Sequence, residues 1–444
     1  GNSRAHVQLG ILYDKGEGIP QNNDMALLHY KAAVENNNHA AQYILGLVYY
    51  FGRLGRQKNH KEAIRLIKQS AMAGLPYAQR VLGQLYQQGS IMKNEREAIR
   101  WYKRAAAGKD VCALGILGKC HEHGIGVDID LEKALAFYAK AAEGDSPYGH
   151  PMSMYSLGLC YYKGIAQEDS KPKLETALEW FEKAARLGVS EAMAYMARIY
   201  LQFMVANANQ PQLAQQHFVK AVQWLKKSAE KNDTYAQREL GKIYLTGKGL
   251  TTDYAMAVHL LSKAAAKNDA EAITFLGDCY HKGTGVDKNM DMAVEHYLRA
   301  ATLDQFPQAF QPLGCCYLNG TGTPVNPMQA IFWFRKSAEE LDDSIAYFNL
   351  ADIYGSGLVQ GVPVDIPLAL SYLNKSADMG YTEAQYRMGM IYLQGEYGAE
   401  EAAATLIRFA QEEKYGYRVY LQVGECFEQG LGVEKNLRQA FHWY

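Results

Sequence analysis

A helical motif that returns twelve times along the chain constrains the fold more than any other feature. The segment AQYILGLVYYFG at positions 41–52 comes back as AQRELGKIYLTG at 236–247 and as AITFLGDCYHKG at 272–283. A marker residue follows the leucine in nine copies and a methionine or valine in the other three, and it is glycine in ten copies and alanine in two. The markers are Gly10, Gly46, Gly83, Gly118, Gly158, Ala197, Gly241, Gly277, Gly314, Ala351, Gly389 and Gly424. Successive markers are 35 to 44 residues apart, a period that is typical of solenoid proteins.

Each copy contains two apolar segments joined by a short loop. In the first segment, leucine and tyrosine recur at positions i and i+4, as Leu240 and Tyr244 do, and so share one face of a helix. The loop is often glycine-x-glycine, and glycine ends helices because it adopts left-handed backbone angles without steric cost. The second segment has helical spacing and closes on a Lys/Arg-x-Ala token, as in EAIRWYKRAAAG at 97–108. The pattern predicts a stack of helical hairpins, each too small to bury its own apolar face.

The unit boundaries follow from the period. We expect a single array over residues 1–444, with a truncated last unit and unit starts near residues 4, 40, 77, 112, 152, 191, 235, 271, 308, 345, 383 and 418. Insertions lengthen the loops at 166–175 and 356–365, and FMVANANQPQLAQQHF at 203–218 is expected to separate the two helices of the sixth unit. Because the chain begins without methionine and ends within a second helix, we expect it to be a fragment of a longer protein.

Composition excludes several classes of function. The net charge is −1 with 21% charged residues. The chain therefore has no overall excess of positive charge, which would indicate nucleic-acid binding. No apolar run reaches the roughly 18 to 20 residues that cross a membrane. Five of the seven cysteines lie two residues after a marker, where other units have small hydrophobic residues. The number of cysteines is odd, and their spacing has no disulfide pattern. Both observations favour reduced thiols and a cytoplasmic location, with the lumen of the endoplasmic reticulum as the alternative.

Catalytic and cofactor motifs are missing from the sequence. The string CHEH at 120–123 gathers potential zinc ligands, but no second pair completes a tetrahedral set, and His121 replaces a packing tyrosine. The glycine-x-glycine loops follow helices, whereas a dinucleotide fingerprint follows a strand. We therefore predict no catalytic, metal-binding or cofactor-binding residues, and a protein that is not an enzyme.

The repeat resembles the Sel-one-like repeat, a relative of the tetratricopeptide repeat. The eighth unit carries almost every element of that pattern, namely Ala272, Leu276, Gly277, Tyr280, Gly283, Gly285, Val286, Ala293, Tyr297 and Ala301. The resemblance implies an all-α fold, a right-handed α-α superhelix of about twelve helical hairpins. It also implies a non-catalytic scaffold or adaptor of the kind found in endoplasmic-reticulum quality control, fungal chitin-synthase activation, signalling and bacterial host interaction. In a secreted bacterial branch of this family, a pair of cysteines cross-links each repeat. This chain lacks those cysteine pairs.

By analogy with tetratricopeptide repeats, the first helices line a concave groove that holds a partner. The groove positions point away from the leucine–tyrosine stripe. The candidates are Tyr43, Leu47, Tyr50, Phe51, Arg80, Tyr155, Leu159, Tyr162, Arg198, Arg238 and Lys242, with the acidic Asp278, Asp352 and Glu425 toward the other end. Aromatic residues and arginine dominate protein interfaces. We therefore expect a partner protein or extended peptide with apolar anchors and acidic residues.

Three alternatives stay open at this point. The tyrosines Tyr43 and Tyr155 could pack within the superhelix instead of facing a ligand. The partner could be a folded protein, or a second copy of the chain, bound to the convex face or the exposed ends, so the oligomeric state is left open. The repeats could also be the regulatory domain of a larger signalling, cell-wall-synthesis-activating or quality-control protein.

Overall fold

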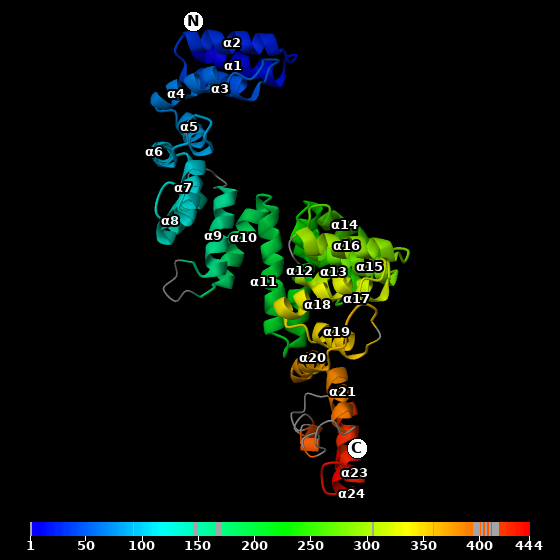
Figure 1. The fold of residues 1–444 in the computed structure, drawn as a ribbon. Coiled ribbons are helices and arrows are strands. Elements are labelled where there is room, and N and C mark those ends of the chain that lie inside the picture. The colour runs from blue at the N-terminus through cyan, green and yellow to red at the C-terminus, as the bar shows by residue number, and fades with distance from the viewer. Residues whose placement is uncertain are drawn as a thin grey trace. The chain divides into compact units, whose positions relative to one another are not determined.

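The computed structural model describes residues 2–91, 93–144, 150–165, 171–303, 306–357, 359–393, a few positions between 400 and 410, and 417–444. These residues form 23 α-helices and one short 3-10 helix, η1 (Pro307–Ala309), with no strand among them (Figure 1). The structure divides into two compact parts, residues 1–231 and 232–444, and each is described by itself.

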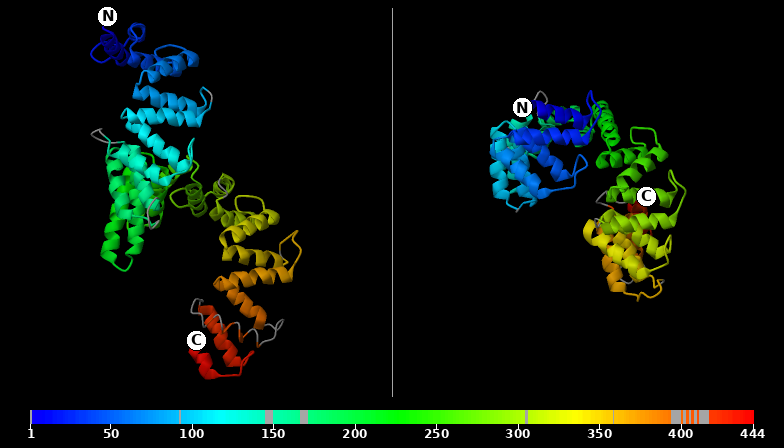
Figure 2. Two further views of the ribbon diagram at one scale, coloured as in Figure 1. Left: turned by 90° about the vertical axis from the view of Figure 1, so that its left-hand side faces the viewer. Right: turned by 90° about the horizontal axis from the view of Figure 1, so that it is seen from above.

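The helices alternate between a first and a second helix of each repeat, called A and B below. The A helices are α1 (Ser3–Lys15), α3 (His39–Phe51), α5 (Pro76–Gln88), α7 (Val111–His123), α9 (Pro151–Lys163), α11 (Ser190–Ala206), α13 (Thr234–Thr246), α15 (Ala270–Lys282), α17 (Phe310–Asn319), α19 (Ser344–Gly355), α21 (Thr382–Leu393) and α23 (Tyr417–Gln429). The B helices are α2 (Asn23–Glu35), α4 (His60–Met72), α6 (Glu95–Ala107), α8 (Leu131–Ala142), α10 (Leu174–Arg186), α12 (Pro211–Glu230), α14 (Tyr254–Ala265), α16 (Met290–Leu303), α18 (Pro327–Leu341), α20 (Ile366–Asp378) and α24 (Leu437–Trp443). Each A helix with a described B helix packs most extensively against it, and Figure 2 shows these pairs from two further sides. The predicted all-helical solenoid of about twelve hairpins is confirmed.

Capping residues fix where the helices begin and end. Asparagine or aspartate precedes most helices, as Asp110 precedes α7 and accepts a hydrogen bond from the backbone N–H of Ala113 at 2.9 Å. Gly124 ends α7 with φ 70°, in the left-handed region, and Gly126 follows with φ 70°. A Cβ on Gly126 would lie 2.6 Å from the carbonyl oxygen of Glu95, at the start of the preceding B helix. The second glycine thus lets the loop of one repeat touch the repeat before it.

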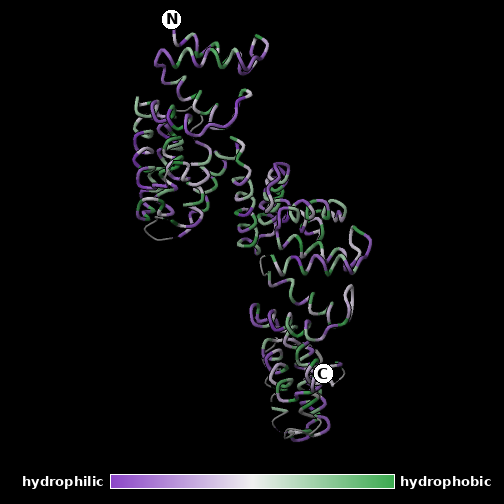
Figure 3. The backbone as a smooth tube through the Cα atoms, turned by 45° about the horizontal axis from the view of Figure 1, so that its top comes forward, coloured by the Kyte–Doolittle hydropathy of each residue, from purple (hydrophilic) through white to green (hydrophobic). Residues whose placement is uncertain are grey.

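The marker glycine makes room for a large side chain of its own repeat's B helix. A Cβ on Gly118 would lie 2.6 Å from the ring of Tyr138, and one on Gly277 would lie 2.6 Å from the ring of Tyr297. Both tyrosine side chains are buried, and the Tyr138 hydroxyl donates to Glu122 Oε2 at 2.6 Å. Along each helix the hydrophobic residues recur at intervals between hydrophilic ones (Figure 3), so the core runs between the helices of every hairpin.

The lysine of the Lys/Arg-x-Ala signature contacts a tryptophan ring in the B helices α10 and α12. Its cation lies three residues after the indole and covers it: Lys183 Nζ is 3.9 Å from the Trp180 ring centroid, and Lys227 Nζ is 4.5 Å from that of Trp224. Such cation–π contacts contribute about 0.5–1 kcal/mol at exposed sites.

The sixth repeat differs from the expectation of an inserted loop. Helix α11 continues to Ala206 and α12 begins at Pro211, so most of segment 203–218 extends the two helices. No glycine stands where the other repeats end their A helix, and the chain therefore stays helical until Asn207. The inserted segment at 356–365 is described except for residue 358, whereas residues 166–170 of the other insertion lie outside the described part.

Candidate functional site

The aromatic candidates of α3 lie partly inside the array. Tyr43, Leu47 and Tyr50 are half-buried and pack against the core cluster that contains Trp101. Burial raises the pKa of Tyr43. By contrast, the Phe51 side chain is 58% exposed and meets the Tyr50 ring edge-on, with 5.1 Å between centroids. At this end of the A-helix face only Phe51, of these four, is largely open to a ligand.

A second aromatic cluster joins α9 to α11. The Tyr195 ring lies 5.9 Å from Tyr155 and 5.3 Å from Tyr162, and the guanidinium carbon of Arg198 lies 4.9 Å from the same ring centroid. Gln202 donates a hydrogen bond from Nε2 to the Tyr162 hydroxyl at 3.0 Å. The sequence reasoning missed Tyr195, which lies two residues before marker Ala197 and also stacks on the buried Phe181, with 5.4 Å between ring centroids.

Arg80 joins consecutive repeats. Its Nε lies 3.0 Å from Oδ2 of Asp110, the buried residue that caps the next A helix. Arg238, three residues before its own marker as Arg80 is, makes the same contact, with Nη1 2.8 Å from Oδ2 of the capping Asp269.

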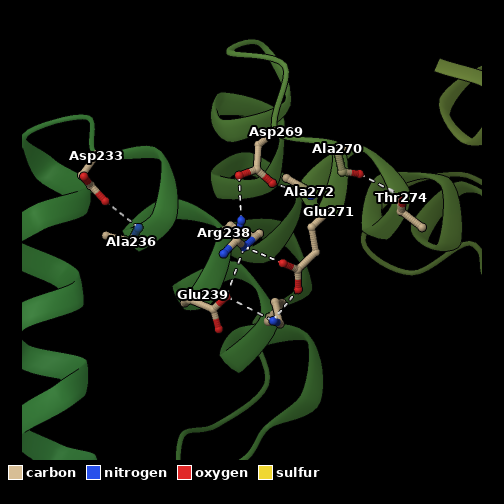
Figure 4. A network of polar contacts seen from close by, with 10 residues as sticks. Asp233, Ala236, Arg238, Glu239, Asp269, Ala270, Glu271, Ala272 and Thr274 are labelled. Atoms are coloured by element: carbon tan, nitrogen blue, oxygen red, sulfur yellow. Dashed lines mark hydrogen bonds and ion pairs between the residues drawn. The ribbon is translucent and has the colours of Figure 1, made fainter. Parts of the chain in front are cut away.

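Arg238 and Lys242 share further carboxylates (Figure 4). Arg238 Nε lies 3.1 Å from Glu239 and 3.0 Å from Glu271, and Lys242 Nζ lies 2.6 Å from Glu271 and 3.1 Å from Glu239. With Asp269, three carboxylates surround two cations. The charges of Arg80, Arg238 and Lys242, which the sequence reasoning assigned to a ligand, are thus paired with carboxylates of this chain and connect neighbouring repeats. The downstream capping aspartate, 30 or 31 residues after each arginine, was the signal that could have shown this.

The acidic candidates are used in a similar way. Asp278 accepts a hydrogen bond from the Tyr297 hydroxyl at 2.7 Å, and Asp352 pairs with Arg387 of the next repeat. Glu425 is exposed.

A groove of about 450 Å³ lies between α7 and α9, consecutive A helices of the first part. Its apolar wall consists of Ile116, Met152, Tyr155 and Leu159. Because Gly115 has no side chain, α7 and α9 approach each other closely at the base of the groove. A Cβ on Gly115 would lie 2.6 Å from Ser153 Oγ.

The rim of this groove is basic. Lys119, His123 and Lys163 line it and are exposed, and none of the three forms an ion pair with any residue that the structure describes. Glu122 is the acidic side chain of the lining, and it accepts the Tyr138 hydroxyl. The sequence reasoning placed Tyr155 and Leu159 on the A-helix face but missed the two lysines beside them.

His121, from the CHEH string, is a packing residue. It is 7% exposed and stacks on Phe137, with 5.5 Å between ring centroids. Burial lowers its pKa, which favours the neutral form of the ring. Within the described ranges no three histidine, cysteine or acidic residues lie together as a metal site requires. The same ranges contain no helix long and apolar enough to cross a bilayer.

The Sel1 repeat model matches the chain twelve times, at residues 3–38, 39–75, 76–110, 113–146, 151–189, 215–233, 234–269, 270–305, 313–340, 344–381, 382–402 and 419–444. Among solved structures, a protective antigen of uropathogenic Escherichia coli strains displaying an SLR fold is 25% identical with a TM-score of 0.56, and the match covers 100% of this chain and 83% of that one.

Two curated relatives are similar over shorter stretches. Chitin synthase regulatory factor 3 of Schizosaccharomyces pombe is 27% identical over 309 residues, which are 69% of this chain. The ERAD-associated E3 ubiquitin-protein ligase component HRD3A of Arabidopsis thaliana is 33% identical over 70 residues, which are 16% of this chain. The matches cover only 28% and 10% of those two relatives.

Proposed function

Because the chain belongs to the Sel1-repeat family, we propose that it is a non-catalytic scaffold that holds a partner protein or an extended peptide against the A helices of its first part. Sel1 repeats are typical of protein-interaction scaffolds, and solenoids of this kind are generally without catalytic activity. The proposal rests above all on the cluster of Tyr155, Tyr162, Tyr195 and Arg198, which joins two A helices with side chains of the types that dominate interfaces.

Phe51 extends the proposed surface toward the N-terminal end, where its ring is exposed. Tyr50 contacts that ring edge-on, and the half-buried Tyr43 and Leu47 add contact area on the same helix. Arg80, Arg238 and Lys242 act on binding only through the shape of the array, since their charges are paired.

Site-specific photocrosslinking tests this surface. A benzophenone amino acid replaces Phe51 or Tyr162 in the whole chain, and irradiation in cells is followed by mass spectrometry of the adducts. Matched controls carry the same group at Leu28 and Met72, exposed residues of the B helices α2 and α4. We expect one shared partner from Phe51 and Tyr162 and none from the controls. Adducts from the control positions alone would place the interface on the B helices.

A second candidate is a regulatory repeat region within a larger protein. The names of the two curated relatives favour it, because one is a regulatory factor and the other a component of a ligase complex. The complete reading frame decides between the two proposals: a kinase or membrane segment encoded in the same frame would support the regulatory domain.

For location we propose a reducing compartment, the cytoplasm; the alternative is the lumen of the endoplasmic reticulum, which is oxidising. The seven cysteines are free thiols, and five of them are buried among apolar side chains. Burial raises the pKa of Cys120 to about 11 and that of Cys160 to about 12, which keeps both thiols protonated and unreactive.

A further inference from the structure

We propose that the groove between α7 and α9 binds an extended acidic peptide, with one apolar side chain of the peptide in the groove and its neighbouring carboxylates at Lys119 and Lys163. This inference rests on the proposed function and specifies both the place on the A-helix face and the chemistry of the partner.

The first argument is the state of the cations. Arg80, Arg238 and Lys242 are half-buried and paired with carboxylates of their own chain. Lys119 and Lys163 differ from them, because both are exposed and neither has an ion-pair partner in the described residues. A cation that pairs with none of the described residues is available to a ligand's carboxylate, and the interaction is charge-assisted.

The second argument is the geometry of the two lysines. Lys119 follows the marker of the fourth repeat, and Lys163 is the last residue of α9 in the fifth. Both line the same groove, so one extended chain can meet both ammonium groups. The charge of Glu122 does not neutralise both lysines, because there is one carboxylate for two ammonium groups. In addition, Glu122 Oε2 already accepts a hydrogen bond from the Tyr138 hydroxyl at 2.6 Å.

The third argument is the apolar wall. Met152 is 48% exposed, and it faces the groove together with Ile116, Tyr155 and Leu159. A volume of about 450 Å³ lies within the range of about 300–1,000 Å³ of small-ligand pockets. The groove therefore has room for a large apolar side chain but not for a folded domain. Apolar anchoring beside charge steering is a combination that fixes both affinity and register.

The test is a selection of random peptides displayed on phage against the whole chain. We expect the enriched peptides to carry aspartate or glutamate next to an aliphatic or aromatic residue. Each enriched peptide is then synthesised with a fluorophore, and its dissociation constant is measured by anisotropy. Binding by the unmodified chain should weaken as salt is added, because both lysines are exposed.

Three variants decide the outcome. The double reversal Lys119→Glu/Lys163→Glu should raise the dissociation constant at least tenfold, and a fresh selection on it should enrich basic peptides. Met152→Glu, on the exposed apolar wall, should also weaken binding at least tenfold. The matched control Lys103→Glu/Lys140→Glu reverses two exposed lysines on the B helices α6 and α8 and should leave binding unchanged.

Failure takes two distinguishable forms. If no peptide is enriched, or if the enriched peptides bind the double reversal variant as tightly as the unmodified chain, the groove assignment is overturned. If those peptides respond instead to Tyr162→Ala, the A-helix face remains the binding surface and only the further inference fails. Circular dichroism confirms that each variant is folded.

Discussion

At the scale of single residues, the marker glycine and the ring above it form one packing unit. Seven glycine markers lie beneath an aromatic ring; the ring residues are Tyr30, Tyr102, Tyr138, Phe181, Tyr297, Phe334 and Tyr444. The two alanine markers, Ala197 and Ala351, occur in repeats where leucine takes the ring position, as Leu225 and Leu373. Gly46 and Gly241 also meet aliphatic residues, Ile67 and Leu261, so both alanine markers occur with a smaller partner but smaller partners are not confined to them.

Gly277→Ala should destabilise the protein by about 1–3 kcal/mol. The new methyl group would lie 2.6 Å from the Tyr297 ring, well inside the 3.5–4.0 Å of ordinary carbon contacts, and this clash outweighs the roughly 1 kcal/mol that alanine gains over glycine in a helix. Urea unfolding followed by circular dichroism measures the change, with the exposed Lys282→Ala on the same helix as control.

The double variant Gly277→Ala/Tyr297→Leu reproduces the natural alanine–leucine pair. It should be more stable than the sum of its single changes by about 0.5–3 kcal/mol, the coupling typical of touching residues. Strict additivity of the two single changes would show that the ring does not rest on the marker.

At the scale of helices, ion pairs connect several A helices to the next one, as they do α5 to α7, α13 to α15 and α19 to α21. Arg238 is 17% exposed and holds the capping Asp269 of α15 from its place on α13. Loss of one partner of a buried pair leaves the other charge without compensation, which is costly.

Arg238→Ala should therefore lower stability by about 3 kcal/mol and speed hydrogen exchange at the start of α15, where the Ala272 amide bonds to Asp269. The control is Arg100→Ala, because its side chain is 76% exposed and, among the described residues, pairs with Glu97 alone on the same helix. That change should stay within about 0.5 kcal/mol. Equal exchange rates in the two variants would contradict the role given to Arg238.

The helices were predicted from the sequence, whereas their ion pairs were missed. Periodicity and capping are local properties, so the hairpins follow directly from the spacing of Leu240 and Tyr244 and from the terminal Gly247. The pairing of Arg238 depends on which residues of the next repeat come within reach, and the sequence places those 31 positions away. The length of α11 was also missed, because a missing glycine was taken as an inserted loop instead of a continued helix.

At the scale of the whole molecule, acid should weaken both parts of the chain. Burial lowers the pKa of His121 and His150 in the first part and of His296 in the second. A histidine whose folded pKa lies below its ordinary value of 6.5 takes up its proton more readily when unfolded. Its contribution to stability is therefore unaffected above about pH 6.5 and falls as the pH drops below that value.

The melting temperature, followed by circular dichroism from pH 8 to pH 5, should fall below about pH 6.5. His296→Phe keeps a ring against Tyr280, which lies 5.4 Å away, and removes the titrating group. The fall should be smaller in this variant and unchanged in the control His259→Phe, an exposed position on α14. If the melting temperature of His296→Phe falls with pH as much as that of the wild type, His296 is excluded as a source of acid sensitivity.

The contact that the second glycine makes in several of the loops has a consequence for how such a chain can change length during evolution. Gly126 meets the carbonyl of Glu95, and Gly285 meets that of Tyr254 in the same way, one repeat back in each case. A duplication or loss of one complete repeat within either part would join surfaces that already fit each other. A gene for this protein could therefore gain or lose binding surface in whole repeats by unequal recombination, without first passing through an unfolded product.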